Sequence, residues 1–237
     1  MTREAVIVST ARTPIGKAYR GAFNNTEAPT LGGHAIREAV ERAGIEPGEV
    51  DDVIIGCAMQ QGSSGYNIGR TAAVAAGLPN TVSGMSIDRQ CSSGMMAIAT
   101  AAKQILQDNM PIVVGCGLES ISLVQNEHRN NFRAQDPNVI AQSEHAYISM
   151  LETAEIVAKR YKVSREQQDE YALQSQQRTA AAQEAGRFDD EIVPLPSKMV
   201  FVDKESGAQS IHDVNLEKDE GNRPTTTLEG LAGLKTV

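Results

Sequence analysis

The sequence predicts an α/β protein whose first half is a layer of mostly parallel strands covered by helices. Short apolar and β-branched runs alternate along this half with segments of helical spacing. Each run is followed by glycine, proline or small polar residues, and the four runs lie at 5–9, 53–55, 82–87 and 112–114. Parallel strands need long crossover connections, so helices between the runs predict a largely parallel sheet.

Three helices are expected between these strands, at 30–43, 67–76 and 92–106. Thr30 and Asn67 can cap the first two, and Gly44 and Gly77 supply their stops. The third helix is apolar nearly all round, which is typical of a helix buried on several sides.

The pattern changes after Gly117. Residues 119–152 are polar and irregular, and two helices are expected to follow at 153–161 and 164–185. The second of these opens with a capping box formed by Ser164 and Gln167. Extended runs at 191–195 and 199–202 then precede a polar loop. We therefore expect an α/β domain at 1–118 and a mainly helical insertion at 119–237, incomplete at its C-terminal end.

Composition excludes several classes of function. The 237 residues carry a net charge of −8 without a basic block, so nucleic acid is not expected as a partner. No apolar run is long enough to cross a bilayer, and no membrane is expected as a partner. Three cysteines without an export signal favour free thiols in the cytoplasm. No metal-ligand cluster or glycine-rich phosphate loop appears, so no cofactor is expected.

Cys91 is the strongest candidate for a catalytic residue. It stands where a strand gives way to a helix, within residues 86–97. Unpaired N–H groups at a helix start carry about half a positive charge, which favours a thiolate and can stabilise an oxyanion. Ser92, Ser93 and Gly94 are small, so an acyl chain could approach the sulfur.

Cys57 and Cys116 have a different setting from Cys91. Each follows or ends an apolar strand, and Cys116 lies between two glycines. The alternative interpretation of a free cysteine, a small buried apolar residue, fits these two better.

Ordered segments along almost the whole chain resemble the thiolase family. Arg-Gln-Cys-Ser-Ser-Gly at 89–94 resembles the family's nucleophile signature, and residues 6–16 resemble its first strand and loop. Further similar segments follow in the family's order at 67–70, 117–122, 153–155, 164–169, 175–176, 219–220, 223–224 and 226–229.

The resemblance implies a thiolase-like fold of two similar βαβαβαββ halves, with a loop domain inserted in the first. It equates 1–118 with the first half, and 119–237 with the loop domain that binds coenzyme A and supports oligomers. By the same resemblance, Cys91 attacks a 3-ketoacyl-CoA, acetyl-CoA leaves, and the acyl group passes to coenzyme A. Met150 is similar to a residue that lines the acyl and pantetheine region, and Arg223 to one that holds the nucleotide.

Other parts that the family uses do not occur in these 237 residues. The histidine of a Gly-His-Pro segment, the second cysteine of a Cys-x-Gly segment and an Asn-Glu-Ala-Phe segment are all missing. The four histidines stand in other contexts: His34, His128, His145 and His212. Groups that act as a unit lose most of their effect when separated, so we expect the isolated chain to be poorly active.

Several interpretations therefore remain open. The segment at 89–94 is closer to degradative 3-ketoacyl-CoA thiolases than to acetoacetyl-CoA-specific biosynthetic ones, and either is possible. A decarboxylating condensing enzyme shares the fold and nucleophile, although the insertion argues against it. A non-catalytic unit of folding or assembly is the alternative from a different class. The resemblance also implies coenzyme A as a substrate and a homodimer or homotetramer.

Overall fold

The computed structural model describes residues 3–236, which form two compact units. The α/β unit contains the residues up to Arg129 together with Asp190–Gly221. The helical unit contains Asn130–Asp189 together with the residues from Asn222 onward. These units differ from the expected division after residue 118, because 119–129 and 190–221 pack with the α/β unit. The expected domain assignment itself stays a prediction.

A three-stranded parallel sheet forms the centre of the α/β unit. Strand β1 (Asp52–Gly56) lies between β2 (Ser83–Ile87) and β3 (Val113–Gly117) and is parallel to both. The register pairs Gly56 with Ile87 on one side and Gly117 on the other. The predicted parallel sheet is confirmed, and its strands end together at one edge.

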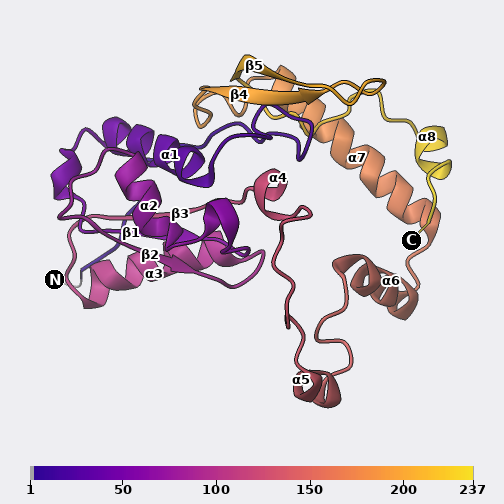
Figure 1. Ribbon diagram of the computed structural model, residues 1–237, viewed down its shortest axis with the longest axis horizontal. Coiled ribbons are helices and arrows are strands. Elements are labelled where there is room, and N and C mark those ends of the chain that lie inside the picture. Colours follow the sequence, from indigo (N-terminus) through magenta and orange to yellow (C-terminus); the bar gives the residue numbers. More distant parts are fainter. Residues whose placement is uncertain (1–2, 237) are drawn as a thin grey trace. The chain divides into compact units, whose positions relative to one another are not determined.

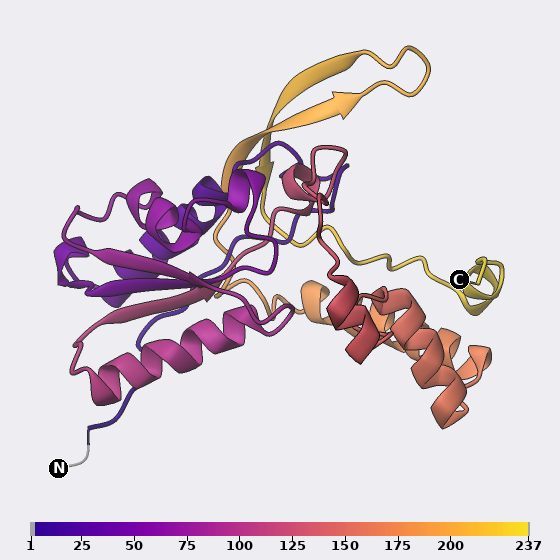
Figure 2. The same ribbon diagram turned by 60° about the horizontal axis from the view of Figure 1, so that its bottom comes forward.

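Helices cover both faces of this sheet (Figures 1 and 2). Val53 and Ile55 of β1 belong to the core formed with α1 (Ala28–Ala43) and α2 (Ile68–Ala75). Ile54 packs instead with α3 (Ser93–Gln107). Successive side chains of a strand point to opposite faces, so the unbroken apolar run of β1 produces two cores.

The helix boundaries follow local capping chemistry. The side chain of Asn67 accepts a hydrogen bond from the Arg70 N–H and starts α2, as predicted. Gly44 ends α1 in the left-handed conformation, with φ of 67°. Helix α1 begins earlier than expected, because its N-cap residue is Glu27 and Pro29 fits its first turn; Thr30 lies within the helix and does not cap it. Two short 3₁₀ turns connect these elements, η1 (Pro47–Glu49) and η2 (Gly62–Ser64).

The prediction that α3 is buried on several sides is wrong for this chain. Ser93, Ala97 and Ala101 are buried, but the side chains of Met95 and Ile98 are 73% and 50% exposed. Within residues 3–236, the sheet covers one face of the helix. Helix α3 therefore has more apolar residues than this unit buries.

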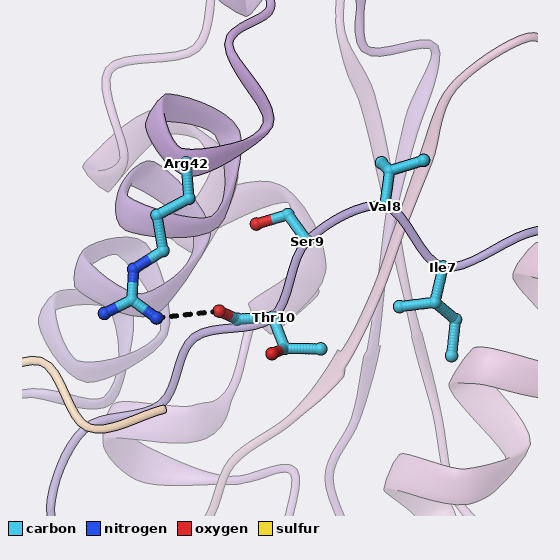
Figure 3. A pocket seen from close by; sticks show the side chains of 5 residues that line it. All are labelled: Ile7, Val8, Ser9, Thr10 and Arg42. Carbon is cyan, nitrogen blue, oxygen red and sulfur yellow. Dashed lines mark hydrogen bonds between the residues drawn. The ribbon is translucent and has the colours of Figure 1, made fainter. Parts of the chain in front are cut away.

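The predicted strand at 5–9 is also wrong, because this segment makes no strand pairing. The segment lines a cavity of about 930 Å³ together with β3, α1 and α3, and it forms no ladder of hydrogen bonds with the sheet. Figure 3 shows it beside α1, where the Arg42 guanidinium donates to the Thr10 carbonyl at 2.9 Å. An isolated parallel bridge joins Arg12, just beyond this segment, to Ile192.

A β-hairpin follows in the α/β unit, where a polar loop had been expected after β4. Strand β4 (Leu195–Val202) pairs with β5 (Gln209–Leu216) along their whole length, in antiparallel register. The base of the hairpin joins the core through an apolar cluster of Ala22, Phe23, Leu31, Leu195, Val214 and Leu216. Strand β5 alternates weakly and is mostly exposed, so it lacks the apolar signal of a strand.

The helical unit holds α5 (Pro137–Gln142), α6 (Met150–Tyr161), α7 (Arg165–Glu184) and α8 (Leu228–Ala232). The capping box predicted for α7 is confirmed. A second box, formed by Ser149 and Glu152, starts α6 three residues before the expected position. Helices α5 and α8, and the short α4 (Ile121–Val124) of the α/β unit, were not expected. No helix among the described residues has the length and apolar character to cross a membrane.

Candidate active site

Cys91 lies in the connection from β2 to α3. It directly precedes Ser92, the N-cap residue of α3, and its side chain is exposed. The expected position at the start of a helix is therefore confirmed, and solvent can reach the thiol. Cys91 is the exposed one of the three cysteines.

A tight turn holds the backbone on the N-terminal side of Cys91. Gln90 has a positive φ of 48°, which non-glycine residues rarely adopt. The Asp88 carboxylate accepts a hydrogen bond from the Gln90 N–H at 2.7 Å. The Ser93 hydroxyl accepts from the Arg89 N–H at 2.8 Å and donates to the Gln90 carbonyl at 2.6 Å. The Ser93 hydroxyl thus holds the Asp88–Arg89 peptide group and the Gln90–Cys91 peptide group, which leads directly into Cys91.

Glycines bring the start of α3 against the edge of the sheet. A Cβ atom added to Gly56 would lie 2.1 Å from the carbonyl carbon of Ser93. One added to Gly117 would lie 3.0 Å from the Cα atom of Gly94. Because backbone meets backbone at both points, the first turn of α3 has a fixed position at the ends of β1 and β3.

The other two cysteines are unsuited to nucleophilic attack. Burial raises the pKa of the Cys57 thiol to about 11, and the negative charge of Glu119 adds to that effect. Burial raises the pKa of Cys116 to about 12. Both thiols are therefore protonated near pH 7, and the thiolate is the nucleophilic form.

Met150 and Arg223, the expected contacts of coenzyme A, belong to the helical unit. Met150 is the first residue of α6 and is largely exposed. Arg223 is exposed in the segment before α8, where its N–H donates to Oε1 of Gln176 at 2.7 Å. The Asn222 amide donates to the same oxygen at 3.0 Å. Gln176 of α7 therefore fixes the backbone that carries Arg223, whereas Cys91 belongs to the other unit.

The histidines do not provide a base for Cys91. His34 lies on α1, where its Nδ1 is 2.8 Å from the Arg37 guanidinium. His212 pairs with the Ser210 hydroxyl on β5, and His128 and His145 are exposed beside glutamates. Among residues 3–236, no hydrogen bond or ion pair of a histidine involves Cys91. In the same residues, no group of three acidic, histidine or cysteine side chains could hold a metal ion.

Sequence reasoning missed the roles of Ser93 and Gln176. Ser93 was interpreted only as a small residue that leaves room for an acyl chain, but it is 4% exposed and fully engaged in the turn. Its spacing from Asp88 offered a signal, since both residue types hydrogen-bond nearby backbone. Gln176 has no local signal, because its partners lie 46 and 47 residues away.

Comparisons with known proteins agree on one family. The family model described as "Thiolase, N-terminal domain" matches residues 5–237. The 3-ketoacyl-CoA thiolase of Bacillus subtilis (strain 168) is 40% identical over 236 residues, which are 98% of this chain and 59% of that protein. The acetyl-CoA acetyltransferase of Rhizobium meliloti (strain 1021) is 40% identical over 240 residues, 97% of this chain and 58% of that protein.

A solved structure agrees with these sequences. The crystal structure of the Bacillus anthracis acetyl-CoA acetyltransferase superposes with a TM-score of 0.78 and 39% identity, covering 99% of this chain and 59% of that one. The chain thus spans somewhat more than half the length of these relatives. The fold is thiolase-like, and the chain belongs to the thiolase family, whose N-terminal domain it represents.

Proposed function

We propose that the chain carries the nucleophile of a thiolase-type acyl transfer, and that this nucleophile is Cys91. The observation that carries the proposal is the exposed thiol at the start of α3, in contrast to two protonated cysteines. Membership of the thiolase family supports an acyltransferase, and relatives named 3-ketoacyl-CoA thiolase and acetyl-CoA acetyltransferase indicate the substrate class.

The proposed reaction has two halves. The Cys91 sulfur attacks the C3 carbonyl carbon of a 3-ketoacyl-CoA, and the C2–C3 bond breaks. Its electron pair leaves as the enolate of acetyl-CoA, which takes up a proton, while the shortened acyl group remains as a thioester on Cys91. The thiolate of coenzyme A then attacks this thioester, the bond between the acyl carbon and the Cys91 sulfur breaks, and the shortened acyl-CoA leaves with the Cys91 thiolate restored. The reverse sequence is a Claisen condensation.

The start of α3 supplies the electrostatic part of this chemistry. N–H groups of a first helical turn have no partner within the helix and can donate to an oxyanion. The contacts of Gly56 and Gly117 with residues 93–94 hold that turn in place, so little reorganisation is needed as negative charge develops. We propose coenzyme A as a substrate of this site and no cofactor.

We propose that Arg223 and Met150 contact coenzyme A from the helical unit. A guanidinium suits phosphate groups, and Gln176 already orders the Arg223 backbone. Replacing Arg223 with alanine should raise the Kd for coenzyme A about tenfold, measured by calorimetry. Arg178→Ala, on the exposed surface of α7, is the matched control and should leave the Kd unchanged. Equal Kd values for the two variants would contradict the role of Arg223.

The proposal also covers the direction of the reaction, the assembly and compartment of the protein, and the turnover of the isolated chain. The Arg-Gln-Cys-Ser-Ser-Gly segment favours degradative cleavage of 3-ketoacyl-CoA over acetoacetyl-CoA-specific biosynthesis. We propose a homodimer or homotetramer in the cytoplasm. The described histidines make no contact with Cys91, so the isolated chain should have low turnover.

Acetyl-CoA formation tests the proposal. The chain is mixed with acetoacetyl-CoA, and acetyl-CoA is quantified by chromatography against Cys91→Ala. We expect about one equivalent per chain in the first half-reaction, followed by slow turnover, and none from Cys91→Ala. A second candidate, a non-catalytic assembly unit, is favoured by the exposed apolar face of α3. Equal acetyl-CoA from both proteins would establish that candidate and contradict acyl transfer.

A further inference from the structure

We propose that Ser93 is a positioning residue that holds Cys91 in its reactive orientation by fastening the turn at 88–91. The inference rests on the proposed function, because it assumes that Cys91 receives the acyl group. It concerns a side chain that does not itself meet the substrate. The evidence is the pair of hydrogen bonds that the Ser93 hydroxyl makes on either side of Gln90.

The turn needs such a fastening because its backbone is unfavourable. Gln90 adopts φ of 48° without being glycine, a conformation that persists only when surrounding contacts enforce it. Asp88 provides one contact, through the Gln90 N–H. The Ser93 hydroxyl provides two more by accepting from the Arg89 N–H and donating to the Gln90 carbonyl, beside the backbone bonds from the Ser92 and Ser93 N–H groups to the Arg89 and Gln90 carbonyls. The carbonyl of Gln90 belongs to the peptide group that leads directly into Cys91.

Ser93 is itself buried and packed against the sheet, which makes it an effective anchor. Its side chain is 4% exposed, and its backbone lies against Gly56 at the end of β1. The hydroxyl therefore transmits the position of the sheet to the turn. Without it, the Arg89 N–H loses its partner and the Gln90 carbonyl keeps the weaker backbone bond from the Ser93 N–H, so Gln90 can relax toward a common backbone conformation.

The neighbouring serine offers a matched control. Ser92 is exposed, and its side chain makes no capping hydrogen bond. Ser92→Ala and Ser93→Ala remove the same hydroxyl one residue apart, but only the second breaks the fastening of the turn. Ser93→Thr keeps the hydroxyl and serves as the conservative rescue.

The test has two readouts on the 237-residue chain. Hydrogen exchange measured by mass spectrometry should be about tenfold faster at 88–92 in Ser93→Ala, with a peptide from α1 as the reference for global stability. Acylation of Cys91 by acetoacetyl-CoA should be about 10- to 100-fold slower, because a displaced nucleophile loses its alignment with the carbonyl. Ser92→Ala should match the wild type in both, and Ser93→Thr should restore most of both.

The outcomes separate this inference from the proposed function. Unchanged exchange at 88–92 in Ser93→Ala overturns the inference, as does acylation equal to that of Ser92→Ala. If the wild-type chain itself is not acylated, the proposed function fails. In that case the exchange result alone decides whether Ser93 holds the turn, and faster exchange confined to 88–92 supports it.

Discussion

The two units of this chain are stabilised in different ways. In the α/β unit, each of the three long helices buries residues against the sheet, and β1 is buried along its whole length. In the helical unit, none of α5–α8 has a buried residue. Helix α7 is polar nearly all round, and its local support comes from a capping box and the Arg165–Asp169 ion pair.

The difference matches the separate role proposed for each unit. A nucleophile needs a fixed position, and the α/β unit provides one by packing the start of α3 on the sheet edge. The helical unit offers exposed side chains on helices ordered by local hydrogen bonds, as expected of a surface that meets a ligand. Substitutions should therefore have large effects in the first unit and small ones in the second.

The largest expected effect is in the core of β1. Ile54 is fully buried against α3, and Ile54→Ala should lower the free energy of unfolding by about 2–5 kcal/mol. Ile156 of α6 is 36% exposed, and Ile156→Ala removes the same atoms from the helical unit. Ile156→Ala should lower the free energy of unfolding by less than about 1 kcal/mol. Equal losses for the two variants, measured in urea titrations followed by circular dichroism, would contradict the difference between the units.

The ion pair between Arg12 and Asp219 should rank second. Asp219 accepts two hydrogen bonds from the Arg12 guanidinium, at 2.7 and 3.0 Å, and one from the Ile15 N–H at 2.8 Å. Asp219→Asn should lower the free energy of unfolding by about 1–3 kcal/mol, because the partly buried Arg12 loses one of its two carboxylate partners and keeps only Glu191. Asp213→Asn, which removes the exposed pair with Lys198, is the control. Equal unfolding midpoints for the two variants would contradict this ranking.

The same carboxylate predicts a pH dependence. Burial raises the pKa of Asp219, but hydrogen bonds from Arg12 and the Ile15 N–H, with the charge of Arg12, outweigh burial and lower it below its usual value. A depressed pKa in the folded state gives stability that is complete above the unfolded value of about 4 and is lost as pH falls further. Below pH 4, stability of the wild type should therefore fall more steeply than that of Asp219→Asn. If the free energy of unfolding fell equally steeply with pH in the wild type and in Asp219→Asn, Asp219 would be excluded as the source of the acid sensitivity.

The smallest expected effect is at the start of α7. The Ser164 hydroxyl accepts from the Gln167 N–H, and Ser164→Ala should cost the helix about 1 kcal/mol. Ser175→Ala lies on the same helix without a capping role and should have almost no effect. Hydrogen exchange of the first turn of α7 measures the difference. Faster hydrogen exchange in the α/β unit of Ser164→Ala would show that the two units are less independent than their separate packing indicates.

Local chemistry made much of the fold predictable. Asn67, Gly44 and the Ser164–Gln167 box marked helix ends that the structure confirms, and three apolar runs became the parallel sheet. Failures occurred where tertiary context decides. Residues 5–9 have strand-like composition, but they pair with no strand of the sheet, and composition alone does not supply a partner. Strand β5 has little apolar pattern and forms because β4 pairs with it.

The candidate site was predictable to a similar degree. The placement of Cys91 at a helix start followed from the change in periodicity at 86–97, and the structure confirms it. The hydrogen bonds of the turn before Cys91 could not be predicted in the same way. The sequence places Ser92 and Ser93 side by side and does not reveal that the Ser93 hydroxyl is the buried one. The assignments of Met150 and Arg223 to coenzyme A stay predictions, because they came from the family resemblance.

The most direct test of the central claim is the location of an acyl group after brief exposure to acetoacetyl-CoA. The quenched protein is digested, and acetylation is quantified by mass spectrometry on the peptides that contain Cys57, Cys91 and Cys116. The exposure of Cys91 and the protonation of Cys57 and Cys116 predict a thioester on Cys91 and almost none on the other two. An unmodified Cys91, or equal labelling of all three cysteines, would contradict the account.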